Sequence, residues 1–170
     1  MATFHLKIPK LFNLQAAPHE IVMYTDGSSR GNPGPGGYGT LLMFKGKKRE
    51  LSGGYRKTTN NRMELMAVIK GLEALTKDGV HLIIYSDSQY VVKAVQEGWL
   101  KNWIKTDFKG GKKNRDLWTR FYELSQKHHI RFHWVKGHAE NPFNNRCDIL
   151  ATTAADGTDL EVDTFFESGG

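Results

Sequence analysis

YTDGSSRGNPGPGGYG, residues 24–39, is the stretch that decides how this chain folds. The residues that lead into it, 21–24, are rich in β-formers, which predicts a strand, and residues 39–44 predict a second strand antiparallel to the first. Asp26 therefore follows the end of the first strand. Because Asp before Gly is commonly a turn former, Asp26 gains a chemical role only if other acids join it in the folded chain.

The bulk composition is typical of a globular protein of one domain, since 170 residues can bury a core without metal or disulfide staples. The formal net charge of +6 favours a polyanionic partner, either nucleic acid or an anionic membrane surface. No apolar run reaches about 18 residues and no signal-peptide pattern is present, so we expect a cytoplasmic protein without a membrane partner. Cys147 is the single cysteine, and we interpret it as a small buried apolar residue rather than a nucleophile.

The chain divides into an arm, a domain and a tail. Residues 1–19 are basic and free of acid, and we expect an N-terminal arm that is ordered only if it docks. Residues 20–155 carry the regular patterns of the domain, in which residues 50–55 predict a third strand that closes a meander. Residues 156–170 form a polar, acidic C-terminal tail, which we expect to be disordered at its end.

Two more acids lie at the boundaries of predicted elements. Glu64 falls in the first turn of a helix predicted over residues 58–77, where the helix dipole favours an acid without any function. Residues 80–85 are almost unbroken apolar, as in a central strand buried on both faces, and Asp87 follows them before a helix over 89–96. Open α/β sheets place their sites at this edge, although Asp87 could also cap the helix.

Residues 98–115 interleave aromatic and basic side chains. This pattern predicts a surface patch for phosphates, and a solvated helix and loop is the structural alternative. Trp99 and Trp103 are spaced i, i+4, so we expect both to pack into the core while the lysines face a ligand. Residues 116–127 then predict an amphipathic helix and residues 129–135 a strand.

The last candidates lie in a polar segment after that strand. His138 stands beside a glycine in a predicted loop and lacks the apolar context of a core histidine, so it suits a mobile proton carrier. Asp148 falls in the first turns of the following helix, where the dipole again provides a structural explanation.

Four carboxylates, at Asp26, Glu64, Asp87 and Asp148, thus sit at element boundaries. If they converge, their repulsion requires cations, and oxygen ligands without His or Cys select Mg²⁺ or Mn²⁺ over Zn²⁺. Two such ions about 3.5–4 Å apart can activate water on one side of a phosphodiester and stabilise the leaving oxygen on the other. The residues alone therefore predict metal-dependent phosphoryl transfer beside a basic groove.

Six sequence blocks, in order and at matching spacing over residues 20–155, resemble the bacterial type 1 ribonucleases H. The blocks are TDGS (25–28), GNPGPGGYG (31–39), TNNRMEL (59–65), SDSQY (86–90), WVKGH (134–138) and NRCD (145–148). The resemblance implies an α/β, ribonuclease H-like fold: a five-stranded mixed sheet, its first three strands antiparallel, with helices on both faces. It also implies endonucleolytic hydrolysis of the RNA strand of RNA/DNA hybrids by a monomer, leaving 5′-phosphate and 3′-hydroxyl ends.

The resemblance further implies the roles of individual residues. The four carboxylates match the family's ligands for two ions of Mg²⁺, for which Mn²⁺ can substitute, and His138 matches a loop histidine that assists product release. Glu64 also has the substrate's 2′-hydroxyl, which separates RNA from DNA, within reach. Residues expected along the minor groove and RNA backbone are Gly27, Asn32, Asn60, Asn61 and Gln89. Residues expected at the DNA strand are Lys57, Thr59 and Asn114 in a phosphate pocket, and Trp99 and Trp103 in a basic protrusion that is shorter here than is usual.

Two other functions compete with this interpretation. A non-catalytic hybrid-binding module would explain the basic groove, but it gains nothing from clustered negative charge near phosphate. An integrase or resolvase that cuts DNA on the same fold would lack the side chains that read the 2′-hydroxyl. Cleavage tests on hybrid, RNA/RNA and DNA/DNA duplexes separate these possibilities.

Overall fold

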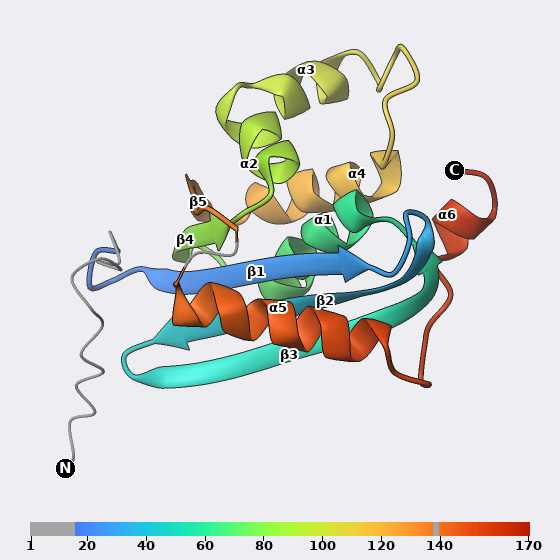
Figure 1. Cartoon of the computed structure of the whole chain (residues 1–170). Helices are drawn as coiled ribbons and strands as arrows, with labels where there is room; N and C mark the ends of the chain where they lie inside the picture. Colours follow the sequence, from blue (N-terminus) through green and yellow to red (C-terminus); the bar gives the residue numbers. More distant parts are fainter. Residues whose placement is uncertain (1–15, 138–139) are drawn as a thin grey trace.

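The computed structural model of the chain describes residues 16–137 and 140–170, in which one five-stranded sheet is flanked by helices (Figure 1). The strands lie in the order β3-β2-β1-β4-β5. They are β1 (Ile21–Ser29), β2 (Gly34–Phe44), β3 (Lys47–Thr58), β4 (His81–Ser86) and β5 (His129–Trp134). The helices are α1 (Asn60–Glu73), α2 (Gln89–Gln96), α3 (Trp99–Lys105), α4 (Arg115–Ser125), α5 (Pro142–Ala155) and α6 (Thr164–Glu167).

The sheet is mixed, as predicted. The first three strands form an antiparallel meander, whereas β4 runs parallel to β1 and β5 parallel to β4. Helix α5 covers one face of β1, β2 and β3, and α1 lies on the other face with α2 and α4 nearby (Figure 1). The expected five-stranded ribonuclease H-like architecture is thereby confirmed.

Two apolar cores hold these layers together. The larger core joins the α1 face of the sheet to α2 and α4, and its centre includes the fully buried Trp118. The smaller core lies under α5 and contains Tyr24, Phe143 and Cys147. Cys147 is fully buried, and burial raises the pKa of its thiol, in agreement with the interpretation of this cysteine as a packing residue.

The meander strands are longer than the sequence pattern predicted. β2 begins at Gly34 rather than at residue 39, and β3 covers residues 47–58 rather than 50–55. The glycines that obscured the pattern serve helix packing: a Cβ on Gly37 would lie 2.3 Å from the Ala151 carbonyl oxygen of α5. Glycine at residue 37 therefore lets α5 approach β2 closely.

Helix α1 is shorter than predicted, since it begins at Asn60 and ends at Glu73 rather than near residue 77. Thr59 caps its start by accepting a hydrogen bond from the Arg62 amide at 3.3 Å. At its end the Leu75 amide bonds to the Leu72 carbonyl at 3.2 Å, a tighter turn that stops the helix.

The expectation of a disordered end to the C-terminal tail is wrong. Glu161 bridges to β3, with its amide 2.9 Å from the Gly54 carbonyl and its carbonyl 2.9 Å from the Arg56 amide, and α6 follows. The guanidinium of Arg62, which is 1% exposed, binds Asp163 of this tail at 2.7 Å. Composition could not reveal this anchor because the buried arginine lies about a hundred residues away in sequence.

No helix in the described part of the chain is long and apolar enough to cross a membrane.

Candidate active site

The end of the β1–β4 pairing brings two of the predicted acids together. The parallel pairing stops at Thr25 and Ser86, so the next residues, Asp26 and Asp87, lie side by side at that edge. The prediction that Asp26 follows the end of β1 is wrong. The strand continues to Ser29, and Asp26 pairs with Gly39 of β2. It is the pairing with β4, rather than the strand, that ends at Asp26.

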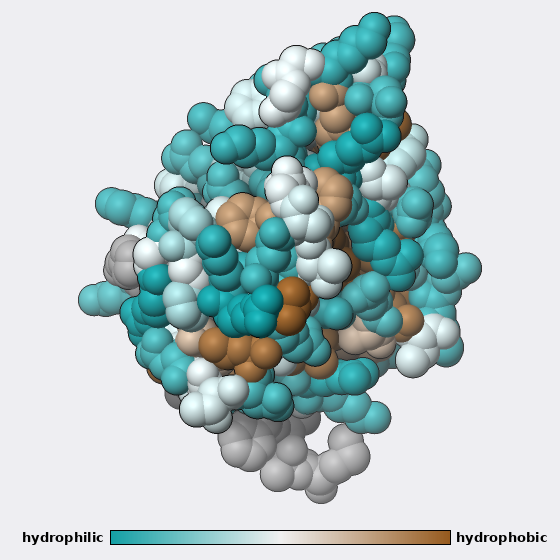
Figure 2. Space-filling model, turned by 90° about the vertical axis from the view of Figure 1, so that its right-hand side faces the viewer, coloured by the Kyte–Doolittle hydropathy of each residue, from teal (hydrophilic) through white to brown (hydrophobic). Residues whose placement is uncertain are grey.

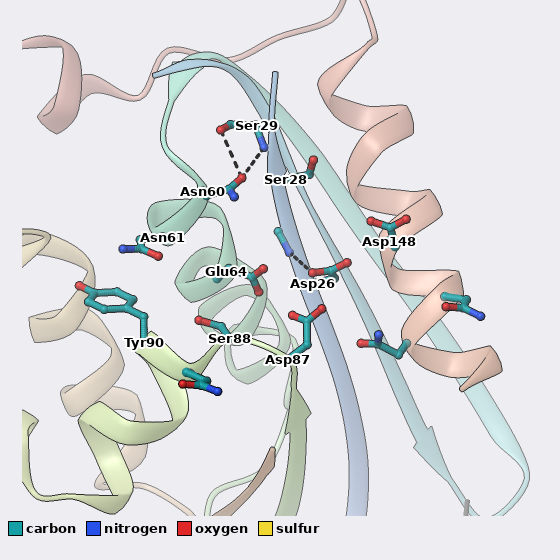
Figure 3. A pocket seen from close by; sticks show the side chains of 14 residues that line it. Asp26, Ser28, Ser29, Asn60, Asn61, Glu64, Asp87, Ser88, Tyr90 and Asp148 are labelled. Carbon is teal, nitrogen blue, oxygen red and sulfur yellow. Dashed lines mark hydrogen bonds between the residues drawn. The ribbon is translucent and has the colours of Figure 1, made fainter. Parts of the chain in front are cut away.

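The third acid comes from α1. Glu64 faces the strand ends, and one carboxylate oxygen from each of Asp26, Glu64 and Asp87 lies within 4.8 Å of the other two (Figure 3). The Gly27 amide donates a hydrogen bond of 2.9 Å to Asp26 Oδ1, which orients that carboxylate. Glu64 Oε2 is buried and has no hydrogen-bond partner among the described residues. A buried carboxylate oxygen that lacks a hydrogen-bond partner in an acidic cluster is available to bind a cation.

Burial and mutual repulsion perturb the pKa values of the acids in this cluster strongly. Burial, aided by the negative charge of Asp87, raises the pKa of Asp26 to about 8. Burial likewise raises the pKa of Glu64 well above its usual range, with the charges of Asp26 and Asp87 as further causes. Without a cation, the three groups cannot all ionise readily near neutral pH.

Asp148 stands on the opposite wall, on α5. It lines the same polar cavity, of about 480 Å³, and its charge contributes to the raised pKa of Asp26 (Figure 3). It does not belong to the group of three whose oxygens lie within 4.8 Å of one another. Asp148 is the seventh residue of α5 and thus lies in its second turn, where the helix dipole has less effect than in the first turn.

Polar side chains form the upper rim of this cavity. Asn60 Oδ1 accepts hydrogen bonds from the Ser29 amide at 2.8 Å and from its hydroxyl at 3.2 Å (Figure 3). Asn61 and Gln89 line the cavity and are exposed at its edge. The structure thus brings the predicted amides of residues 60, 61 and 89 to the acids.

A second cavity of about 670 Å³ adjoins the first, since Asn61 lines both. Asn32, Thr59 and Asn114, all predicted to bind substrate, line it. Lys57 is exposed but is not among its lining residues, so this member of the predicted phosphate pocket stands apart.

Of the remaining predicted residues, Gly27 lies at the acidic cavity, whereas Trp99 and Trp103 do not. Gly27 lines the acidic cavity, and a Cβ there would lie 2.2 Å from the Glu64 amide nitrogen, so its main role is to admit α1. Trp103 is half-buried against Trp118, with ring centroids 5.8 Å apart. Trp99 is 44% exposed, so it is not the core residue that its spacing predicted. Neither Trp99 nor Trp103 lines either cavity.

The sequence pattern missed several lining residues. Asn144 is 2% exposed, lines the acidic cavity and keeps its Oδ1 without a partner in the described chain. It precedes Asp148 by one helical turn, so the i, i+4 spacing on α5 could have indicated it. Ser28 and Tyr90 also line the cavity, and their places in the TDGS and SDSQY blocks could have indicated them.

His138 lies outside the described residues. The preceding residue, Gly137, is nevertheless close to the acids, because a Cβ built on it would lie 3.0 Å from Asp87 Oδ2. The chain therefore passes beside Asp87 just before it reaches the predicted loop histidine.

The donor set of this site is made of carboxylate oxygens, with no His or Cys in the cluster of described residues. Hard divalent cations prefer such oxygens. The unpartnered Glu64 Oε2 and the raised pKa of Asp26 both indicate a site whose charge a divalent ion would balance.

Comparisons with known proteins agree with this geometry. The family model described as RNase H matches residues 18–156. A ribonuclease H of Lachnoclostridium phytofermentans is 57% identical over 158 residues, covering 87% of this chain and 99% of that protein. A ribonuclease H of Desulforamulus reducens is 52% identical over 148 residues, covering 85% and 92% of the two chains.

Solved structures show the same fold. LC9-RNase H1, a type 1 RNase H, has a TM-score of 0.75 and 26% identity, with 91% of this chain and 83% of that one covered. RNase H1 of Halobacterium salinarum has a TM-score of 0.62 and 29% identity, with 81% and 98% covered. By its sequence, its sheet and its cluster of acids, this chain belongs to the ribonuclease H family.

Proposed function

We propose that this chain hydrolyses the RNA strand of RNA/DNA hybrids endonucleolytically, leaving 5′-phosphate and 3′-hydroxyl ends. One observation carries the proposal: in a chain of the ribonuclease H family, oxygens of Asp26, Glu64 and Asp87 converge within 4.8 Å in a polar cavity. A pure binding module would gain nothing from such a cluster, because it repels the phosphates of its ligand.

We assign the four carboxylates to metal binding, with Mg²⁺ as the ion and Mn²⁺ as its substitute. Two divalent ions, when bound, supply an activated water and neutralise the charge that develops on the phosphodiester. Asp26 lies between Glu64 on the α1 side and Asp148 on the α5 side, so it is the carboxylate best placed to serve both ions (Figure 3). Asp87 lies beside Asp26 at the end of the β1–β4 pairing, and Glu64 Oε2, which has no hydrogen-bond partner among the described residues, has a lone pair available for an ion.

Residues on the rim select the substrate in this proposal. Asn61 and Gln89 are exposed at the cavity edge, where their amides can both donate and accept hydrogen bonds with base edges in a minor groove. Asn60 holds the β1 end in place through Ser29. We assign to Glu64 the further role of accepting a hydrogen bond from a 2′-hydroxyl, the group that separates RNA from DNA.

His138 serves as the mobile proton carrier that assists product release. This role is supported by the position of Gly137, the residue before His138 in the sequence, because Gly137 lies beside Asp87. An imidazole accepts a proton in its neutral form and donates one as imidazolium, and the two forms exchange near neutral pH.

Residues 20–155 form the catalytic unit, which acts as a monomer in the cytoplasm in this proposal. The tail supports that unit through the Arg62–Asp163 pair, so we expect truncation of the chain at residue 155 to lower its stability. Size-exclusion chromatography with light scattering tests the monomeric state.

A cleavage assay tests the function. Hybrid, RNA/RNA and DNA/DNA duplexes with one labelled strand are incubated with protein in Mg²⁺, in Mn²⁺ and in EDTA. We expect cleavage of the RNA strand of the hybrid alone, only with a divalent ion, and none with Asp26→Asn. Asp156→Asn, an exposed acid paired with Arg30 outside the cavity, is the matched control and should cut normally.

Two outcomes would overturn the proposal. If the hybrid remains intact with either ion and Asp26→Asn behaves like the unmodified chain, the proposed hydrolysis is wrong. If the DNA/DNA duplex is cut as fast as the hybrid, the function is that of a DNA nuclease.

A further inference from the structure

The second cavity has a wall that no sequence pattern indicated. Besides the asparagines and Thr59, it is lined by the tail residues Phe165, Phe166, Gly169 and Gly170 and by residues of the loop after α3. Figure 2 looks onto the side of the molecule where α6 lies, and hydrophobic residues are set among hydrophilic ones on this face.

The tail wall is firmly held. Asp163, which precedes α6 and is 4% exposed, binds Arg62 at 2.7 Å and accepts a 2.7 Å hydrogen bond from the Thr58 hydroxyl. Glu167, at the end of α6, pairs with Arg56 at 2.9 Å. Both ends of this short helix are thus fixed to α1 and β3, so its aromatic side chains are held in defined positions.

Phe165 is in an unusual position for a large apolar side chain. Its ring lies 5.5 Å from the Arg62 guanidinium and is 37% exposed. Phe166 beside it is half-buried and also lines the cavity. Exposed aromatic surface held against a polar cavity is typical of a surface on which a planar or sugar group packs.

The facing wall is cationic. Lys112, Lys113 and Arg115 line it, and among the described residues no acidic side chain lines this cavity. Arg115 is neutralised by Asp107 at 2.9 Å, and Lys112 lies 6.0 Å from the Trp103 ring, so the lysines provide the uncompensated charge. Aromatic surface opposite positive charge is the combination that binds a nucleic-acid strand.

We infer that α6 forms part of the substrate groove, with Phe165 and Phe166 packing against a nucleotide of the DNA strand while Lys112 and Lys113 face its phosphates. This inference rests on the proposed function and extends it to a segment outside the domain that the motifs define. The second cavity shares Asn61 with the acidic cavity, so one duplex can contact both. The tail surface contributes to affinity and stays remote from the reacting atoms, so it affects KM and not kcat.

Steady-state cleavage of a labelled hybrid by full-length variants tests the inference. Phe166→Ala and Phe165→Ala should each raise KM at least about fivefold with kcat unchanged, since a stacked base is worth at least that factor. Phe44→Ala is the matched control, because Phe44 is 38% exposed and lies at the far end of β2. Its KM should stay within twofold of the unmodified chain.

Two further measurements keep the test decisive. Urea unfolding of each variant shows whether Phe165→Ala disturbs the Arg62 contact; if it does, Phe166→Ala decides the question. A series of hybrids shortened from either end of the DNA strand should reach a length at which the two Phe variants and the unmodified chain have equal KM.

The inference is overturned if both Phe variants unfold normally and keep KM within twofold on the longest hybrid. It is also overturned if Phe44→Ala raises KM as much, or if the increase persists on every shortened hybrid. A failure of the proposed function is distinguishable, because the unmodified chain would then cut no hybrid.

Discussion

Replacing Asp26 by Asn should stabilise the metal-free protein while it abolishes cleavage. The Asp26 carboxylate is 5% exposed and faces two other acids, and burial with this repulsion raises its pKa from 3.8 to about 8. Asn has nearly the same shape and keeps an oxygen for the 2.9 Å hydrogen bond from the Gly27 amide. It removes the charge and leaves the packing in place.

The sign of the pH dependence follows from linkage. A carboxyl group with a raised folded-state pKa stabilises the fold fully below its unfolded pKa, near 4, and that stability is lost as pH rises toward 8. Each pH unit between the two pKa values is worth about 1.4 kcal/mol, which sets a ceiling of about 6 kcal/mol. Because Glu64 and Asp87 can take up protons in response, we expect a gain of about 1–3 kcal/mol at pH 8.

Urea unfolding followed by far-UV circular dichroism measures this gain. The two proteins are compared in EDTA from pH 4 to pH 8.5, and again in Mg²⁺. We expect equal stability near pH 4, a gap that widens with pH, and a smaller gap in Mg²⁺, because a bound cation offsets the repulsion in the unmodified chain.

Asp156→Asn is the control of opposite sign. The Arg30 guanidinium lowers the pKa of Asp156, so removing this acid should not stabilise the chain at any pH. The reasoning fails if Asp26→Asn is less stable than the unmodified chain at pH 8 in EDTA, or if its gain does not change with pH.

Three other predictions concern the fold and the loop. Arg62→Ala leaves the carboxylates of Asp116 and Asp163 without their cation, so it should lower the free energy of unfolding by about 3–5 kcal/mol, measured in urea. A loss below about 1 kcal/mol would contradict the buried ion pairs. Gly37→Ala places a methyl group 2.3 Å from the Ala151 carbonyl and should cost about 1–3 kcal/mol by the same assay, whereas an unchanged midpoint would refute the close approach of α5. His138→Ala should reduce kcat for the hybrid without abolishing cleavage, and an unchanged kcat would remove the proton-carrier role.

The sequence predicted the sheet because its signals are local. The apolar run of β4 and the helical periodicity of α1 depend on neighbouring residues, so their types were correct and only their ends moved. The start of β2 was missed because glycine and proline mask a strand in which Gly37 and Gly39 admit α5. That requirement lies in another element and leaves no trace in a local window.

The part of the site that could be predicted is the part carried by short continuous sequence motifs. The acids at 26, 64 and 87 lie within recognisable sequence blocks, and the structure brings one oxygen of each within 4.8 Å of the other two. The tail wall at Phe165 was not predictable, because its order depends on the distant Arg62. Trp99 shows the limit of spacing arguments: an i, i+4 pair specifies a shared helix face and not whether that face is buried.

The account depends most on Asp87 as a metal-binding carboxylate that is dispensable for substrate binding. The measurement is cleavage and equilibrium binding of one labelled hybrid by Asp87→Asn in Mg²⁺. Asp78→Asn, an equal charge change in the loop before β4, is the control at the opposite end of the same strand. We predict that Asp87→Asn cuts no RNA yet binds the hybrid at least as tightly as the control; cleavage at the control rate would contradict the account.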